Sequence, residues 1–129
     1  MVTINMSKEY YTMPGMERYP FCSAVKAGDY IYLSGNAALK DDEGNDLTTV
    51  ESQTHQIMKN FRSILENFDA TMDDIVKVTI FLGDQGEWGN MNEIYKSYFT
   101  GPLPARSTCI AGLVIPGFLL EMECVAYKP

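Results

Sequence analysis

Two charged residues lie in otherwise apolar, strand-like runs near the C-terminal end of the chain. Arg106 follows Pro104-Ala105, and Glu121 comes fifteen positions later, with Val, Ile, Leu, Met and Cys residues around both. An apolar environment has little tolerance for an unpaired charge, so the pair indicates a site in two neighbouring strands. A guanidinium can bind both oxygens of a carboxylate, and a glutamate beside it can move a proton. These residues predict chemistry on a small carboxylic acid.

The elements that position these residues follow from the hydrophobic pattern. Runs rich in β-branched and aromatic residues predict strands at residues 30–35, 75–82, about 106–113 and about 119–127. Apolar residues at spacings of three, four and seven predict helices over about residues 49–68 and 88–99. Thr48 or Thr49 can cap the first helix. Residues 1–20 are expected to form a partly irregular lead-in, and residues 26–29 have the composition of a turn.

This order predicts one α+β domain over residues 1–129, a mixed β-sheet with two helices packed on one face. The first helix suits a right-handed crossover between parallel strands, and whether the last two strands form a hairpin stays open. Alternation in the last strand directs four residues toward the helices, Leu120, Met122, Cys124 and Ala126, and directs Glu121 and Glu123 the other way. Arg106, Thr108 and Ile110 share a face of the preceding strand.

The face without helices is expected to drive self-association. We place Leu119, Val125 and Ile110 on it, and a small protein rarely leaves such a surface in contact with water. A cyclic oligomer is the simplest way to cover the same surface on every copy. Charged residues at the margin of this face would then line clefts between subunits.

Composition argues against several classes of function. With 10 Lys and Arg against 17 Asp and Glu, the formal net charge is −7, and no basic cluster offers a surface for nucleic acid. No apolar run reaches the roughly 20 residues of a membrane span, and the N-terminus does not resemble a secretory signal, so we expect a cytoplasmic protein. The cysteines lack metal-ligand spacing. Cys109 and Cys124 are expected to be buried.

The sequence as a whole resembles a known family, the RidA (YjgF) family of enamine/imine deaminases, also labelled L-PSP endoribonucleases. The resemblance covers about residues 19–128 and is carried by five segments: Gly28-Asp29 to Ser34-Gly35, residues 73–82, residues 91–99, Pro104-Ala105-Arg106-Ser107, and Leu120-Glu121-Met122-Glu123. It implies a chorismate-mutase-like fold and a homotrimer with active clefts between subunits.

The resemblance also implies roles for individual residues. Arg106 matches the arginine that binds the substrate carboxylate, and Glu121 matches the glutamate that positions or activates water. Glu123 matches a second acid, and Gly35 and Asn92 match positions near the cleft.

Two positions depart from the family pattern. Phe21 replaces a tyrosine at the cleft mouth and so lacks its hydroxyl, and Thr108 replaces a cysteine. Backbone groups around that cysteine take part in the family chemistry, so Thr108 need not abolish activity. These departures bear on the substrate more than on the type of reaction.

The leading hypothesis is hydrolytic deamination of small 2-enamino or 2-imino acids to 2-oxo acids and ammonia, without a metal or cofactor. Other interpretations stay open: an intersubunit ion pair between Arg106 and Glu121, a non-catalytic binder of carboxylate metabolites, or a pathway-specific deaminase of 2-aminomuconate-like intermediates. A further hypothesis is an endoribonuclease, but a protein of net charge −7 repels the phosphate backbone of RNA.

Overall fold

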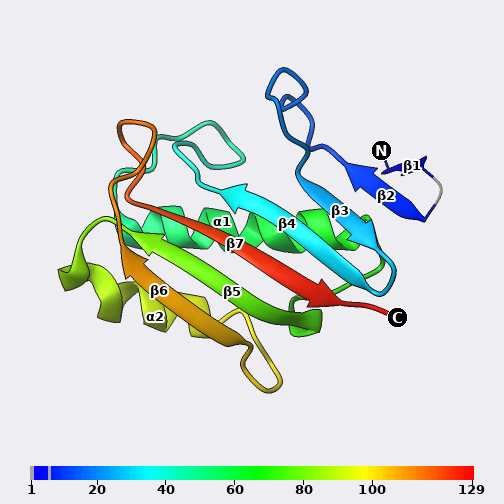
Figure 1. The fold of residues 1–129 in the computed structure, drawn as a ribbon. Helices are drawn as coiled ribbons and strands as arrows, with labels where there is room; N and C mark the ends of the chain where they lie inside the picture. Colours follow the sequence, from blue (N-terminus) through cyan, green and yellow to red (C-terminus); the bar gives the residue numbers. More distant parts are fainter. Residues whose placement is uncertain (1, 6) are drawn as a thin grey trace.

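A seven-stranded sheet carries two helices on one of its faces in the computed structural model, which describes residues 2–5 and 7–129 (Figure 1). The strands are β1 (Val2–Asn5), β2 (Lys8–Tyr11), β3 (Ala24–Ala27), β4 (Tyr30–Asn36), β5 (Ile75–Leu82), β6 (Ala105–Ile110) and β7 (Leu120–Tyr127). The helices are α1 (Val50–Glu66) and α2 (Trp88–Lys96), with short 3-10 turns η1 (Met72–Asp74) and η2 (Gln85–Glu87). The predicted α+β class and mixed sheet are confirmed.

The strand order is β1-β2-β3-β4-β7-β5-β6. Of the six pairs of hydrogen-bonded neighbours in this order, β5 with β6 is parallel and the other five are antiparallel. We had expected the strands that carry Arg106 and Glu121 to be neighbours. They are not, because β5 lies between β6 and β7. The first helix does join parallel strands, since β4 and β5 are both antiparallel to β7. β7 is inserted between the two.

The N-terminal region is more regular than its sequence indicated. Residues 1–20 contain β1 and β2, and the turn predicted at residues 26–29 begins only after β3 has ended at Ala27. β1 to β3 are four residues each, and so short a run gives only a weak strand signal in a sequence. Their backbone groups are satisfied by antiparallel pairing with one another and with β4.

Helix α1 begins at a capping box. Thr49 accepts a hydrogen bond from the backbone N–H of Ser52 at 3.1 Å, and the Ser52 hydroxyl oxygen accepts one from the Thr49 N–H at 3.3 Å. One turn into the helix, fully buried Gln53 donates to the carbonyls of Leu47 and Gly117 and accepts from the N–H of Leu119. The bonds to Gly117 and Leu119 tie α1 to the segment that leads directly into β7.

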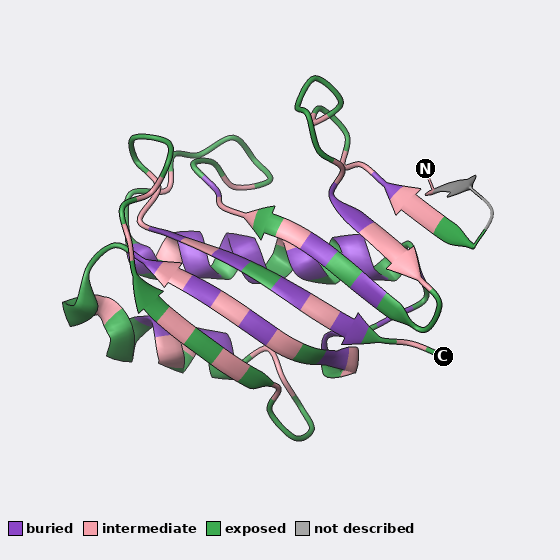
Figure 2. Ribbon diagram, viewed as in Figure 1, coloured by how far each residue is buried: buried purple, intermediate pink, exposed green. Residues whose placement is uncertain are grey.

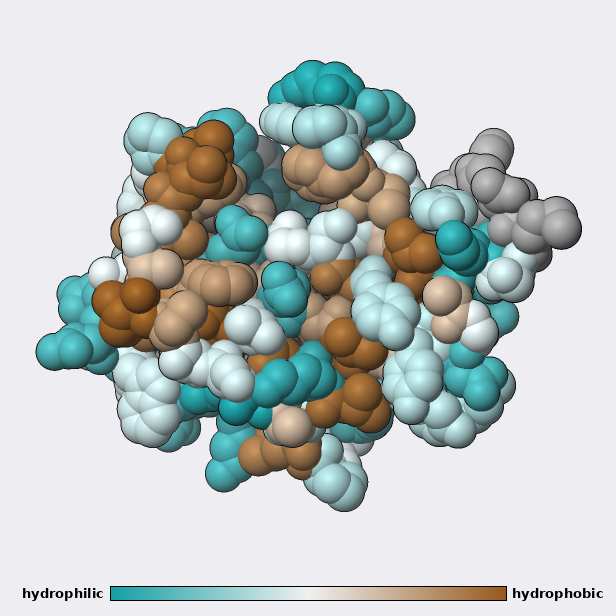
Figure 3. Space-filling view, in the orientation of Figure 1, coloured by the Kyte–Doolittle hydropathy of each residue, from teal (hydrophilic) through white to brown (hydrophobic). Residues whose placement is uncertain are grey.

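The core lies between the helices and the sheet. Burial alternates along β7 as predicted, with Leu120, Met122, Cys124 and Ala126 buried against the helices (Figure 2). The other face, toward the viewer in Figure 1, is covered by no element of the described chain, and Figure 3 shows hydrophobic and hydrophilic residues interspersed over it. We call it the open face. No helix in the described residues is both long and apolar enough to cross a membrane.

Three residues lie where we did not place them. Cys109 is exposed on the open face, whereas Cys124 is buried as expected. Ile110 does not share the open face with Val125, because β6 pairs Ile110 with the buried, helix-facing Leu82. Leu119 packs against the core beside the start of α1 and not on the open face. The differences at Cys109 and Ile110 have one cause, since the pairing of β6 with β5 sets which of its residues face the helices.

Candidate active site

Arg106 points toward the helices from the edge of the sheet. In the parallel pairing of β5 with β6, Arg106 aligns with the buried Val78, and its guanidinium carbon lies 4.9 Å from the ring centroid of Tyr95 on α2. The two residues line a pocket of about 320 Å³, together with Asn92, Lys96, Leu103 and Pro104. The pocket therefore has two cationic side chains and no carboxylate in its lining.

The guanidinium of Arg106 has no anionic partner in the part of the chain that the structure describes. The single ion pair there joins Lys40 and Asp46 at 2.6 Å, and no described residue accepts a hydrogen bond from the Arg106 side chain. Two polar atoms of the same pocket, Asn92 Oδ1 and the Tyr95 hydroxyl, are buried without a hydrogen-bond partner among these residues. Such groups call for a ligand or solvent to satisfy them.

The Tyr95 hydroxyl stays protonated at working pH. Burial raises the pKa of Tyr95 to about 12, a change that the positive charge of Arg106 opposes and the nearby Cys124 adds to. The ring face beside the guanidinium is therefore electrically neutral and carries the partial negative charge of its π electrons.

Glu121 lies on the open face, next to Gly35. The carboxylate oxygen Oε2 occupies the space where a Cβ on Gly35 would project, so any larger residue at position 35 would collide with it. Burial, followed by repulsion from Glu123, raises the pKa of the Glu121 carboxyl above its ordinary value. A raised pKa suits a carboxylate that takes up a proton during a reaction.

Phe21 belongs to the loop beside the end of β4. The Ser34 hydroxyl donates to the Cys22 carbonyl at 2.6 Å, which ties the residue after Phe21 to the residue before Gly35. The Phe21 ring is half-exposed and stacks on Tyr19, with centroids 5.7 Å apart. An exposed aromatic pair therefore stands at the same end of the sheet as Gly35.

The predicted site residues thus form two groups rather than one. The first, which we call the arginine half, contains Arg106, Asn92 and Tyr95, and the second, the glutamate half, contains Glu121, Gly35 and Phe21. Thr108 shares the face of Arg106, because it aligns with the buried Ile80. It therefore belongs to the arginine half.

The two halves lie on opposite faces of the sheet. Arg106 aligns with Val78 of β5 and Glu121 with Phe81, on the two sides of that strand. Their Cα atoms are therefore separated by about 10 Å along the strands and about 10 Å across them. One protomer cannot bring both groups to one small substrate.

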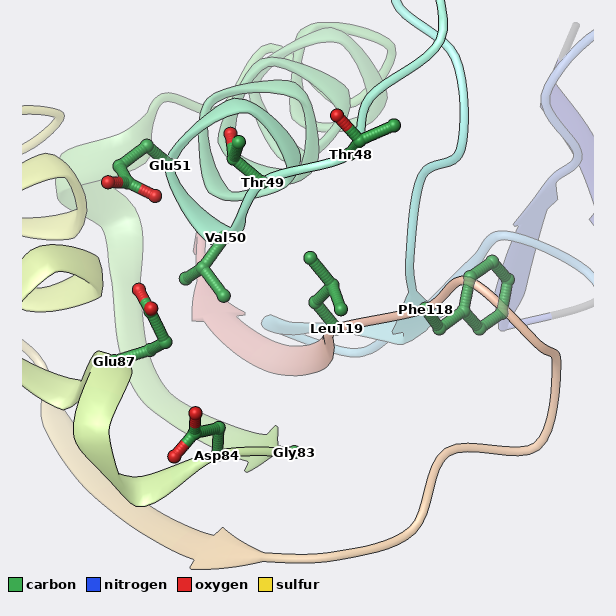
Figure 4. Close-up of a pocket in the computed structure, with 9 residues that line it drawn as sticks. All are labelled: Thr48, Thr49, Val50, Glu51, Gly83, Asp84, Glu87, Phe118 and Leu119. Atoms are coloured by element: carbon green, nitrogen blue, oxygen red, sulfur yellow. The ribbon is translucent and has the colours of Figure 1, made fainter.

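A larger cavity, of about 530 Å³, lies at the start of α1 and does not include any predicted site residue. Figure 4 shows the carboxylates of Glu51, Asp84 and Glu87 along one side of it, and the apolar side chains of Val50 and Leu119 beside them. Three acidic groups repel a carboxylate substrate. Size alone therefore does not locate the site that Arg106 and Glu121 indicate.

Sequence reasoning assigned Tyr95 only to the apolar face of the second helix. Its contact with Arg106 depends on the packing of α2 against β6, which a sequence pattern does not contain. The available signal was its spacing, since Tyr95 follows Asn92 by three residues and thus lies on the same side of the helix.

Comparison with known proteins finds relatives over most of the chain. The model of the family described as Endoribonuclease L-PSP matches residues 16–128. The chain is 34% identical to the mouse protein named 2-iminobutanoate/2-iminopropanoate deaminase, over 84% of this chain and 82% of that one. It is 38% identical to Reactive Intermediate Deaminase A, chloroplastic, of Arabidopsis thaliana, over 83% of this chain and 58% of that one.

Among solved structures, the Rid-family protein YyfA from Yersinia pestis superposes with a TM-score of 0.77 at 34% identity, covering 84% of this chain and 87% of that one. The family match, the identities and the fold agree over most of the sequence. This chain belongs to the RidA (YjgF) family, the family also described as L-PSP endoribonucleases.

Proposed function

We propose that this protein hydrolyses small 2-imino acids, and the 2-enamino acids from which they form, to 2-oxo acids and ammonia. The observation that carries the proposal is the Arg106 guanidinium over the Tyr95 ring, which has no anionic partner among the described residues and lies in a pocket lined by no carboxylate. A substrate carboxylate would supply the missing anion. The names of the mouse and Arabidopsis relatives, both deaminases, support the same reaction.

In the proposed reaction, the enamine first tautomerises to the imine, and Arg106 holds its carboxylate. Water adds to the carbon of the protonated imine, and Glu121 accepts one proton from that water, so that a neutral carbinolamine forms with the former C=N nitrogen as its amine. Glu121 then gives this proton to the amine, the C–N bond breaks and ammonia leaves, while the hydroxyl oxygen forms the C=O bond and passes its own proton to the Glu121 carboxylate. Backbone groups around Thr108 help to hold the water. Positioned proton transfer of this kind contributes on the order of 10²–10⁴ in rate.

Because the two halves face opposite sides of the sheet, we propose that each active cleft forms between subunits of a homotrimer. The arginine half of one subunit then meets the glutamate half of its neighbour. The open face offers a surface for this association, since Tyr30, Tyr32 and Tyr127 are all more than 40% exposed there. Cytoplasmic location and the absence of nucleic-acid partners remain predictions from the sequence.

The direct test is ammonia release from 2-aminoacrylate generated in situ by a separate lyase. Arg106→Ala should abolish the release, and Arg106→Lys should restore little of it, because an ammonium cannot form the paired donor geometry of a guanidinium. Unchanged release by Arg106→Ala would refute the proposal. Calorimetric binding of 2-oxobutyrate without any ammonia release would instead identify a non-catalytic carboxylate binder.

Subunit mixing tests the location of the cleft. Arg106→Ala and Glu121→Gln chains, each inactive alone, are unfolded together and refolded at equal ratio. Each mixed trimer then contains one cleft with both natural residues, so about a quarter of all clefts regain activity. If mixed trimers form but remain inactive, the two residues act within one chain and the intersubunit arrangement is wrong. The trimer itself is checked by light scattering, which should give about three times the 14.5 kDa chain mass.

A further inference from the structure

The Tyr95 ring is the one aromatic platform under Arg106 that the described structure provides, and it is firmly held. Tyr95 is only 5% exposed, and its ring packs against Phe99 with centroids 5.1 Å apart. The guanidinium carbon of Arg106, 4.9 Å from the ring centroid, is within the range of a cation–π contact. A mobile cationic side chain thus rests on an immobile surface.

Arg106 needs such a support more than most arginines do. Its long side chain has many rotamers, and confining it costs conformational entropy. In residues 2–5 and 7–129, no ion pair or side-chain hydrogen bond confines it. The Tyr95 ring is the contact that restricts the guanidinium plane before a substrate arrives.

We propose that Tyr95 is a positioning residue for carboxylate recognition, whose buried ring holds the Arg106 guanidinium so that two of its N–H groups meet the substrate carboxylate together. This inference rests on the proposed function of Arg106. It assigns the positioning of Arg106 to the ring, because the guanidinium carbon lies over the ring centroid and the hydroxyl makes no hydrogen bond with Arg106. Pre-organisation of this kind improves affinity by reducing the entropy lost on binding.

The other two arginines of the chain provide an internal comparison. Arg18 lies 4.8 Å from the centroid of Tyr19, and Arg62 lies 5.1 Å from that of Tyr98. Neither of those tyrosines is buried, whereas Tyr95 is. The stacking distance is therefore common to all three pairs, and the buried platform distinguishes the pair in the candidate site. Tyr98 supplies a matched control, because removing its ring takes the platform from an arginine outside that site.

The test uses the full-length protein with 2-oxobutyrate as a stable carboxylate probe and the imine formed in situ as substrate. Tyr95→Met removes the ring but fills the space with a flexible side chain, and we expect it to raise both Kd and KM about fivefold, with a smaller change in kcat. Tyr95→Phe, which keeps the ring, should recover most of this loss. Tyr98→Leu should leave both constants unchanged. Tyr95→Leu serves as the second ring deletion if Tyr95→Met does not fold.

A double-mutant cycle separates positioning from a general packing effect. In an Arg106→Ala background, replacing Tyr95 by Met should weaken 2-oxobutyrate binding no further, because the ring acts through Arg106. An equal loss in both backgrounds, or a folded Tyr95→Met protein with natural Kd and KM, overturns the inference and leaves the proposed function standing. If Arg106→Ala alone binds the probe normally, the proposed function fails and this inference fails with it.

Discussion

Replacing Gly35 by alanine tests whether Glu121 must sit where the structure places it. A Cβ on Gly35 would collide with Glu121 Oε2 and lie 3.2 Å from its Cδ. The carboxylate must then move by about 1 Å to restore a normal contact distance, because close-packed atoms rarely approach below their van der Waals separation. A shift of this size in a reacting group can cost about 10²-fold in rate.

The fold itself should tolerate the change. The φ angle of Gly35 lies outside the left-handed region that favours glycine, so alanine fits the backbone. The obstructing atom is the end of a flexible side chain, and alanine reduces the entropy of the unfolded chain by about 0.4–1 kcal/mol. We expect the free energy of unfolding to change by less than about 1 kcal/mol, while kcat for ammonia release falls about 100-fold.

The assay compares Gly35→Ala with Gly89→Ala by denaturant unfolding and by ammonia release. Gly89 is exposed within α2 and has open space at its Cβ position, so its replacement should stabilise the helix by up to about 1 kcal/mol without lowering kcat. A folded Gly35→Ala protein with natural kcat refutes the reasoning. Such a result means that the carboxylate position beside Gly35 is unimportant for the reaction.

Four further outcomes are expected. The raised pKa of Glu121 means that the folded state binds more protons than the unfolded state. The free energy of unfolding therefore falls as the pH rises from the ordinary pKa of a glutamate through the pKa of Glu121 in the folded protein. Glu121→Gln should remove this fall, and melting temperatures measured across that pH range will detect the difference. Glu123→Gln should move the acidic limb of kcat/KM to lower pH by removing a like charge. Thr49→Ala should cost about 1 kcal/mol in urea unfolding, and Thr48→Ala much less. Gln53→Leu leaves three backbone groups unpaired and should cost about 3 kcal/mol or more in the same measurement.

The elements with strong periodicity could be predicted from the sequence. The stripe of α1 and the alternation of β7 were assigned correctly, because burial against one apolar layer imposes a period on both. β1 and β2 were missed, since short strands at the edge of a sheet pair through their backbones and need no particular side-chain pattern. The strand order could not be predicted either, because β7 pairs with β4 and β5, which are far from it in the sequence.

The chemistry of the site was easier to foresee than its geometry. Arg106 and Glu121 were identified because charges in apolar runs are unusual. Their separation on opposite faces was not, since the phase of β6 relative to β7 depends on both strands pairing with β5. Cys109 was misplaced for the same reason, because strand residues alternate between faces but the sequence does not say which face the helices cover.

The opposite faces of Arg106 and Glu121 also explain why each charge is tolerated. Each lies at a partly exposed position of its own face, and neither has an ion-pair partner within the described residues. Had the two formed a pair within one chain, each would have satisfied the other and left no unmet charge for a substrate. A sheet that keeps them apart leaves a cation free for a carboxylate and a carboxylate free for a proton. Assembly of subunits can then join the two groups around a substrate without first breaking an internal salt bridge.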